Sequence, residues 1–372
     1  MVPNGWLHKQ IGEIASIQVG RDLVEDKYSE ISTTEYKYPV YSNTVENKGL
    51  YGFYNFPEYS GNAITIVGRG VGLGKAFARS PGESFGAIGR LLVLTPKNNS
   101  FDVIFFANYI NFALRIHNES GGIPQLPGAS LSKYFVMLPP LAEQQKIAQI
   151  LSTWDKAIAV TEQLLPNSQQ QKKALMQQLL TGKKRLLDEN GARFEGEWEE
   201  FSLGNIAKVY QPKTISQSQL SFDGYPVYGA NGIIGYYCDF NHELEQIAVT
   251  CRGSTCGVVN WTMPKSWITG NAMVINVDNN SAISKKFLFY VLSNADLKYL
   301  ITGSGQPQIT GDIKNHVVHL ASFKEQKVIA QVLTIADQEI EVLQRKLDCL
   351  QQEKKALMQQ LLTGKRRVKV AA

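Results

Sequence analysis

The sequence predicts an α+β protein in which one unit occurs twice, each unit being a mixed α/β globular domain followed by a long helix. Two observations predict this fold. The twelve residues KKALMQQLLTGK occupy positions 172–183 and recur, letter for letter, at 354–365. In each copy they end a run of about forty residues that matches the other run without a gap and has the apolar spacing of a helix. A match of that length does not arise by chance, so the chain contains an internal repeat.

The long runs have apolar residues alternately four and three apart, which is the a/d pattern of a helix that pairs with another helix. Neither helix buries this seam by itself, and the simplest partner for each is the other. The alternative is that each helix packs separately on its own globular domain. The predicted seam residues are Ile147, Leu151, Trp154, Ile158, Leu175 and Leu179 in the first run, and Ile329, Leu333, Ile340, Leu343, Leu347, Leu357 and Leu361 in the second.

Both runs close on Thr-Gly, and Gly182 and Gly364 can adopt the left-handed conformation that ends a helix. One difference stands out between the runs. Pro166 lies in the middle of the first, where the second has Asp348. Because proline has no amide hydrogen and clashes with the preceding turn, a kink or break in the first helix is expected there.

The globular segments before the two helices are related more loosely. Arg69-Gly70 corresponds to Arg252-Gly253, and Pro124-Gln125 to Pro307-Gln308, while the offset drifts as loops are inserted and deleted. Strands are expected at 63–67, 91–95, 247–250 and 272–277, and amphipathic helices at 101–116 and 286–300. The predicted organisation is a first globular domain at 1–138, a helical region at 139–186, a linker at 187–195, a second globular domain at 196–320, a second helical region at 321–366 and a tail at 367–372.

Composition narrows the class of protein. The 372 residues carry a net charge of +5, a mild excess that permits nucleic-acid binding without requiring it. No stretch has the length of a membrane span, and the N-terminus has no apolar run of the signal-peptide kind. The four cysteines all lie in the second half, which argues against a disulfide framework. A cytoplasmic protein with no membrane partner is therefore expected.

Three kinds of active site are missing from the sequence. The glycine-rich stretch 68–76 fits neither the P-loop nor the dinucleotide-binding spacing, so a flexible loop between strands is expected there. An amino-methyltransferase would carry an Asn/Asp-Pro-Pro-aromatic tetrapeptide, whereas the only Pro-Pro is Pro139-Pro140, which is typical of a helix start. No clustered carboxylates with a nearby lysine indicate a metal-dependent nuclease. No catalytic residue is predicted.

Zinc was the remaining chemical possibility. Cys238, His242, Cys251 and Cys256 are residue types that bind zinc, but their spacing is not that of a recognised zinc knuckle. The first unit also has Gly68 where the second has Cys251. Buried, reduced cysteines are therefore expected, and no metal is predicted. A duplicated, slightly basic chain without an active site is most simply a binding protein.

Several motifs occur in a fixed order along the chain. EQQKIAQIL begins the first long run at 143–151, LMQQLLTGKKRL ends it at 175–186, and a tryptophan and Leu-Gly follow about twenty residues later. GSGQPQ lies at 303–308. Together, over nearly the whole chain, these motifs resemble the specificity subunit of Type I restriction-modification enzymes.

This resemblance implies that the chain reads an asymmetric, two-part sequence in double-stranded DNA, with one target recognition domain for each half-site. It implies that the two long helices pack antiparallel as a coiled coil, which gives the chain an internal pseudo-twofold axis. Two methyltransferase subunits would bind around it, and motor-nuclease subunits would join for cleavage. S-adenosylmethionine, ATP and magnesium would belong to those partners, so no cofactor is expected in this chain.

Candidate DNA-binding residues follow from the repeat. The two domains should read different sequences, so an arginine present in both is expected to contact phosphate or to be structural, and base readers are expected among residues that differ. The candidates are Arg21, Asn43, Arg69, Lys75 and Arg79 in the first domain, and Lys213, Asn231, Arg252, Lys265 and Gln306 in the second. The basic runs 183–185 and 365–367 are interpreted instead as charges that complement the dipole at helix ends.

Two other classes of function stay open. One is a self-contained DNA-modifying enzyme with an unrecognised catalytic motif, and the other is a coiled-coil scaffold that binds only protein. Co-expression with a methyltransferase partner separates the three. A specificity subunit directs adenine methylation only in that company, the enzyme acts alone, and the scaffold never does.

Overall fold

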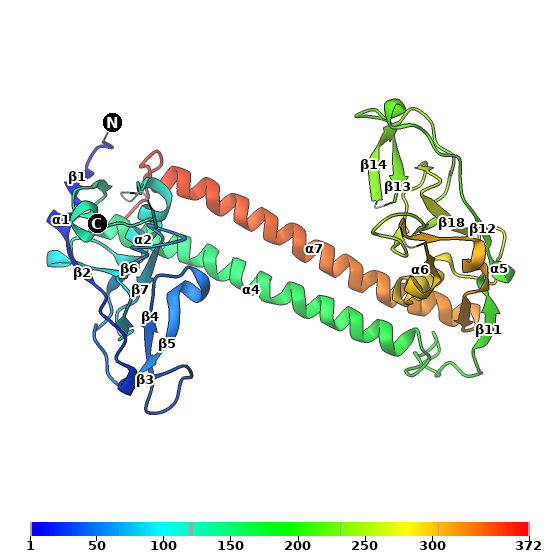
Figure 1. Cartoon of the computed structure of the whole chain (residues 1–372), viewed down its shortest axis with the longest axis horizontal. Coiled ribbons are helices and arrows are strands. Elements are labelled where there is room, and N and C mark those ends of the chain that lie inside the picture. Colours follow the sequence, from blue (N-terminus) through cyan, green and yellow to red (C-terminus); the bar gives the residue numbers. More distant parts are fainter. Residues whose placement is uncertain (1, 119–121, 231, 304, 371–372) are drawn as a thin grey trace. The chain divides into compact units, whose positions relative to one another are not determined.

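We describe the protein from a computed structural model that covers residues 2–118, 122–230, 232–303 and 305–370. Two long helices, α4 (Leu141–Leu179) and α7 (Phe323–Leu361), each follow a globular domain (Figure 1). The first domain contains β1 Leu7–Gln10, α1 Ile11–Ile14, β2 Ala15–Val19, β3 Tyr28–Ser29, β4 Tyr38–Tyr41, β5 Leu50–Tyr54, β6 Ala63–Ile66, β7 Ala76–Arg79, β8 Gly86–Ala87, β9 Leu92–Pro96, α2 Val103–Ala113, α3 Gly128–Leu131 and β10 Phe135–Leu138. The second contains β11 Glu199–Ser202, α5 Leu203–Ile206, β12 Lys208–Tyr210, β13 Tyr225–Gly229, β14 Gly232–Tyr237, β15 Ile247–Thr250, β16 Val259–Trp261, β17 Trp267–Ile268, β18 Ala272–Asn276, α6 Lys285–Asn294, β19 Ile301–Thr302, β20 Gln308–Ile309 and β21 Val317–Leu320.

The centre of the first domain is a four-stranded antiparallel sheet with the order β2-β9-β6-β7. Strand β6 is buried along its whole length, and successive side chains enter different clusters because they point to opposite faces of the sheet. Ile64 and Ile66 pack in the core that includes α2, while Ala63 packs with Tyr41 and Phe85. Tyr41 belongs to a second sheet of order β3-β5-β4-β8.

The second domain repeats this plan. Its central sheet has the order β12-β18-β15-β16, and its second sheet has the order β14-β13-β17. The predicted strands correspond to β6, β9, β15 and β18, and the predicted helices to α2 and α6, with small shifts at their ends. In the helix predicted at 286–300, α6 stops at Asn294 and a short 3-10 turn occupies Leu297–Leu300.

The helices α4 and α7 lie side by side and run in opposite directions (Figure 1). Asp155 binds Lys354 and Glu162 binds Gln351, so residue numbers rise along one helix as they fall along the other. The pairing is reciprocal, because Lys172 of the first repeat binds Asp337 of the second at the equivalent positions. At about 1.5 Å per residue, the 39 residues of each helix extend over roughly 58 Å.

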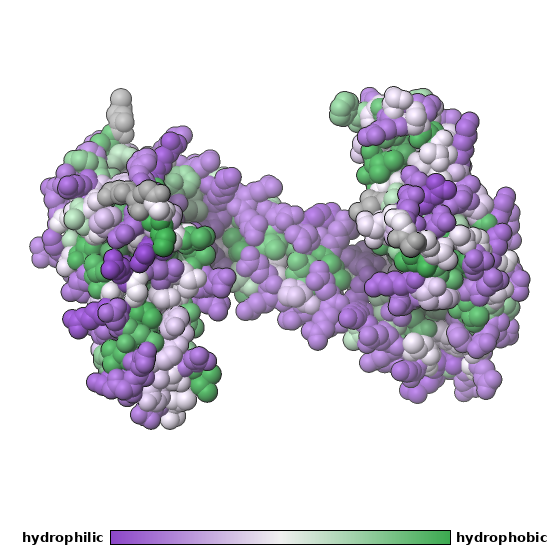
Figure 2. Space-filling model, in the orientation of Figure 1, coloured by the Kyte–Doolittle hydropathy of each residue, from purple (hydrophilic) through white to green (hydrophobic). Residues whose placement is uncertain are grey.

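Every predicted seam residue is buried or half-buried. Leu347, for example, is 9% exposed, whereas Val342 on the same helix is 54% exposed. Hydrophilic residues cover most of the visible surface of the helix pair (Figure 2).

Within the described ranges, no helix is long and apolar enough to cross a membrane.

The ends of the helices also complete the cores of the two domains. Ile147 and Leu151 of α4 pack with Leu361 of α7 in the core of the first domain. Leu179 and Leu333 do the same in the second. The compact units are accordingly residues 1–162 with 346–372, and residues 163–345. The long helices therefore pack on each other, as the seam predicted, and their ends also pack on the globular domains, as the alternative interpretation had it.

Helix α4 is continuous through Pro166, so of the predicted kink or break the break is wrong and the kink stays a prediction. The proline ring removes one backbone hydrogen bond, the one that the carbonyl of Glu162 would accept. Half-buried Leu165 and buried Ser168 keep this turn on the seam, and Ser168 Oγ donates to Glu339 Oε1 across the pair at 3.4 Å. Packing along the seam thus holds the helix together where its own hydrogen bonding is incomplete.

Candidate nucleic-acid interface

In the first domain, several loops meet at one edge of the central sheet. Strands β2 and β6 end at this edge and β7 and β9 begin there, because the register pairs Val19 with Leu92, and Ile66 with both Leu92 and Ala76. A further segment joins them through a bridge between Arg69 and Gln125. We call residues 20–21, 67–75, 88–91 and 124–126 the first loop edge.

The second domain has the same edge built from the equivalent loops. Strands β12 and β15 end there and β16 and β18 begin there, since Thr250 pairs with Ala272 and Val249 with Val259. The bridge between Arg252 and Gln308 matches that between Arg69 and Gln125. We call residues 211–214, 251–258, 269–271 and 307–309 the second loop edge.

The Arg-Gly dipeptide is held in the same way at both edges. The amides of Gly70 and Gly253 donate to the carbonyls of Pro124 and Pro307, at 2.9 and 3.0 Å. Both glycines have φ of 87°, a left-handed conformation that favours glycine, and there is open space around each. The backbone at these points is therefore shaped and accessible in the same way in each domain.

None of the eight edge segments contains aspartate or glutamate, whereas Arg21, Arg69, Lys75 and Arg90 are exposed on the first edge and Lys213 and Arg252 on the second. Exposed Asp22 and Glu46 lie next to the first edge. Exposed guanidinium and ammonium groups are the groups that proteins use to hold DNA phosphates.

Family comparison decides which kind of protein carries these edges. Residues 3–167 and 195–352 match the family described as the Type I restriction modification DNA specificity domain. The chain belongs to this family. It is a specificity subunit of a Type I restriction-modification system, and the family domain occurs in it twice.

Relatives match this specificity subunit over most of their length. A Mycoplasma pneumoniae protein named as a type I specificity subunit is 27% identical over 87% of this chain and 87% of its own. The specificity subunit of the MjaVIII Type I restriction enzyme of Methanocaldococcus jannaschii is 23% identical over 99% of this chain and 94% of its own. The crystal structure of a Type I S subunit from M. genitalium has the same fold, with a TM-score of 0.72 at 18% identity over 97% of this chain and 99% of that one.

Half of the predicted DNA-binding residues of the specificity subunit, five of ten, lie on its loop edges. Arg21, Arg69 and Lys75 lie on the first edge, and Lys213 and Arg252 on the second. Gln306 is exposed two residues before Gln308. Asn43 lies beside the first edge and ties two of its loops together, accepting from the amide of Gly68 at 2.8 Å and donating to the carbonyl of Gly89.

Of the other predicted residues, Lys265 and Arg79 lie away from the loop edges, and Asn231 is outside the described residues. Lys265 follows β16 at the opposite end of the sheet from Arg252 and pairs with Glu243 at 3.8 Å. Asn231 falls outside the described residues, as does Ser304 of the GSGQPQ motif.

Arg79 is buried, so its proposed role as a base reader is wrong. It is 3% exposed, and its Nε and Nη2 donate to Thr65 Oγ1 at 3.1 and 2.9 Å. Nη2 also donates to the carbonyl of Lys48 at 2.6 Å, and the guanidinium lies 3.3 Å from the centre of the Tyr41 ring. Burial lowers the pKa of Arg79. Burial and the hydrogen bond donated to Glu83 raise the pKa of Tyr41 to about 12.

The sequence reasoning missed Arg90, Gln125 and Gln308. Arg90 is exposed with φ of 68°, and it lines a cavity of about 280 Å³ together with Arg69 and Gln125. The repeat of Pro124-Gln125 and Pro307-Gln308 was a usable signal for the glutamines. No sequence signal marked Arg90, because its place at the edge depends on the register of β9.

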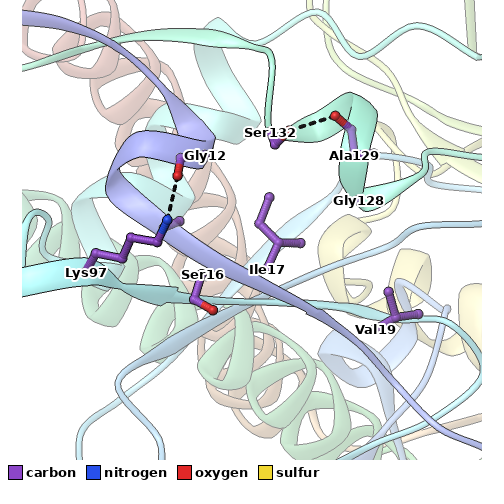
Figure 3. Close-up of a pocket in the computed structure, with 9 residues that line it drawn as sticks. Gly12, Ser16, Ile17, Val19, Lys97, Gly128, Ala129 and Ser132 are labelled. Carbon is purple, nitrogen blue, oxygen red and sulfur yellow. Dashed lines mark hydrogen bonds between the residues drawn. The ribbon is translucent and has the colours of Figure 1, made fainter.

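A larger cavity of about 430 Å³ adjoins this one and shares Val19 and Gly128 with it (Figure 3). Its lining side chains are mostly small, and its one charged side chain, Lys97, donates from Nζ to the carbonyl of Gly12 at 2.7 Å. The nine lining residues include no carboxylate, histidine or cysteine that would serve as a catalytic base or nucleophile.

The four residues considered for zinc do not form a ligand cluster. Cys251 and Cys256 are buried and Cys238 is exposed, while His242 uses both ring nitrogens in hydrogen bonds to Tyr210 Oη and Asn241 Oδ1, at 2.8 and 2.6 Å. Across the described residues no group of three or more histidine, cysteine, aspartate or glutamate side chains could hold a metal ion. Burial raises the pKa of the Cys251 and Cys256 thiols.

The basic runs at the helix ends have a specific structural role. Arg367 binds buried Glu143, from Nε at 2.7 Å and Nη2 at 2.6 Å, and its Nη1 donates to the carbonyl of Asn4. Arg185 binds buried Glu325 in the same two-pronged way, at 2.6 and 2.7 Å. We call each pair a latch, because it joins the end of one long helix to the start of the other within one unit. The last residue of each run is thus committed to protein, not to DNA.

Proposed function

We propose that this specificity subunit reads an asymmetric two-part sequence in double-stranded DNA, one part at each loop edge. The observation that carries the proposal is the presence of the same acid-free edge, with the same Arg-Gly loop, in two domains whose other residues differ. Phosphate contacts fix the position of a protein on DNA, and contacts to base edges supply sequence discrimination. The equivalent arginines of the two domains suit phosphate contacts, and the neighbouring residues that differ suit contacts to bases.

We propose that α4 and α7 set the gap between the two half-sites and bear the surfaces for the enzymatic partners. Two methyltransferase subunits would bind around the chain and methylate one adenine in each half-site, and motor-nuclease subunits would join for cleavage. S-adenosylmethionine, ATP and magnesium would be bound by those subunits. Covalent duplication gives one chain two readers, as dimerisation does for a repressor, and also allows the readers to diverge.

Co-expression tests this function. The chain is produced in a host lacking adenine methylation of this kind, alone and together with its methyltransferase partner, and methylated adenines are mapped across the genome. Methylation at a two-part motif only when both are present is the expected result. A chain that methylates DNA alone would be a self-contained enzyme. No methylation in either case, with a soluble complex formed, would support a scaffold and contradict the proposal.

A further inference from the structure

The two domains differ most clearly in the hairpin beside the loop edge. In the first domain, residues 42–49 separate β4 from β5, whereas residues 230–231 alone separate β13 from β14 in the second. We call residues 42–49 the hairpin loop. It rests on the first loop edge, through the two hydrogen bonds of Asn43 and through Val45, which packs so closely on Gly72 that a side chain there would collide with it.

The tip of the hairpin loop has a defined and costly shape. Asn47 and Lys48 have φ of 44° and 54°, a left-handed conformation that is uncommon for residues other than glycine and less unfavourable for asparagine than for lysine. Glu46, Asn47 and Lys48 are all exposed. Their side chains are of the three kinds that pair with cytosine, adenine and guanine edges respectively.

Arg79 supplies the surroundings that hold this tip. Its Nη2 reaches the carbonyl of Lys48 while the same guanidinium is fixed by Thr65 and stacked on Tyr41. The second domain has no equivalent cation. Arg79 pairs with Ala63 at the far end of β6. At the offset of 183 that relates Arg69 to Arg252, Ala63 corresponds to Gln246, and the residue opposite Gln246 is Thr262, whose amide donates to the Gln246 carbonyl at 3.0 Å. A buried arginine and a long hairpin loop thus occur together in one domain and are both missing from the other.

We propose that the hairpin loop reads bases in the first half-site, and that Arg79 is the positioning residue that fixes its shape. The inference rests on the proposed function. Arg69 and Gly70 would contact the phosphates in either case, because their geometry is common to both domains. The hairpin loop, which the second domain lacks, would supply discrimination between bases in the first half-site.

Four variants of the full chain, co-expressed with the methyltransferase partner, test this inference by methylated-adenine mapping. Asn47→Gly and Lys48→Gly remove exposed side chains while keeping the left-handed backbone. Asn98→Gly is the matched control, since Asn98 is also exposed and has φ of 52° but lies beyond the other end of β9. Arg79→Met removes the contact with Lys48.

Asn47→Gly and Lys48→Gly should each relax one or more positions in a single half of the motif, lowering discrimination there by about tenfold. The other half should stay unchanged, and Asn98→Gly should give the parent motif. Arg79→Met should relax the same half. A purely structural role would instead lower methylation equally at all sites. If Arg79→Met is insoluble, Arg79→Lys replaces it, and a folded Arg79→Lys protein with the parent motif would overturn the positioning role.

Unchanged motifs in both glycine variants, or a change confined to the other half-site, would overturn base reading by the hairpin loop. These outcomes differ from failure of the proposed function itself. In that case the parent chain and its partner would produce no two-part motif at all.

Discussion

At the scale of single residues, two arginines at the helix ends are structural because each is paired with a buried glutamate. Glu143 and Glu325 are 2% and 0% exposed and are satisfied by Arg367 and Arg185. The latches are equivalent in the two repeats. Each neighbouring glutamine is also buried, with Gln144 and Gln326 donating to the carbonyls of Pro139 and Ala321, at 2.9 and 2.8 Å.

Arg367→Met should destabilise the protein by about 2 kcal/mol or more, because it leaves the Glu143 carboxylate buried without its partner. Denaturant unfolding measures this change. Arg345→Met is the control, since Arg345 forms an exposed pair with Glu341 and should change stability by no more than about 0.5 kcal/mol. Glu143→Gln combined with Arg367→Met should recover part of the loss. Equal effects of Arg367→Met and Arg345→Met would contradict the latch.

His242 should make stability depend on pH. Burial lowers the pKa of His242 in the folded protein, so near pH 6.5 and below the unfolded chain binds a proton that the folded protein does not. Stability should therefore fall as pH drops below about 6.5, by up to about 1.4 kcal/mol per pH unit for this group.

Unfolding free energies measured between about pH 5.5 and 7.5, the range around the unperturbed histidine pKa, test this dependence. His242→Gln should reduce the slope and leave the part that comes from His316, whose pKa burial also lowers. His319→Gln, which changes an exposed histidine of the same domain, should leave the slope in place. An unchanged slope in His242→Gln would mean that another group causes it.

Arginine roles show where sequence reasoning stops at this scale. Arg69 lies three residues after β6 and Arg79 is the last residue of β7, and the residue type alone gave no reason to assign them different roles. The distinction comes from register, which turns Arg79 inward over Thr65 and Tyr41 and leaves Arg69 on a loop. Arg69 and Arg252 were identified because repetition marked them, and Arg90 was missed because nothing did.

At the scale of elements, the long helices were the most predictable part of the chain. Their apolar period is independent of tertiary context, so the seam positions and both helix ends could be identified from spacing and from Gly182 and Gly364, which have φ of 68°. A kink or break at Pro166 was predicted from local chemistry alone. The helix does not break there, because packing against α7 supplies stabilisation that the local sequence does not contain.

Leu333→Ala should cost about 2–5 kcal/mol, because Leu333 is fully buried between the helix pair and the core of the second domain. Ile335→Ala, two residues further along the same helix, removes a side chain that is 56% exposed and should cost less than about 1 kcal/mol. Thermal and denaturant unfolding of both variants make the comparison. Similar losses in the two would contradict the burial of the seam.

At the scale of the whole molecule, each unit is assembled from segments distant in sequence. The core of the first domain includes Leu361 and Leu362 from the far end of the chain, and that of the second includes Leu179 and Leu180. The repeat predicted two similar domains, but not that each would need both helices to close its core. That arrangement depends on packing between residues far apart in sequence, Ile147 with Leu361 in the first domain and Leu179 with Leu333 in the second, which spacing within one helix does not encode.

The central claim is that the two domains read DNA independently, and a domain exchange tests it most directly. Residues 1–138 are replaced by the corresponding domain of a relative, while Ile147, Leu151, Leu361 and Leu362 are kept so that the new core is closed as before. Methylated adenines are then mapped for the parent and the exchanged chain with the same methyltransferase partner.

One half of the motif should change, while the half read by residues 196–320 and the gap between the halves should be retained. Contacts in well-separated half-sites contribute roughly additively, at about 1–3 kcal/mol for each mismatch, so a new first reader leaves the second unaffected. A change in both halves, or in neither, from a folded and active complex would contradict the account.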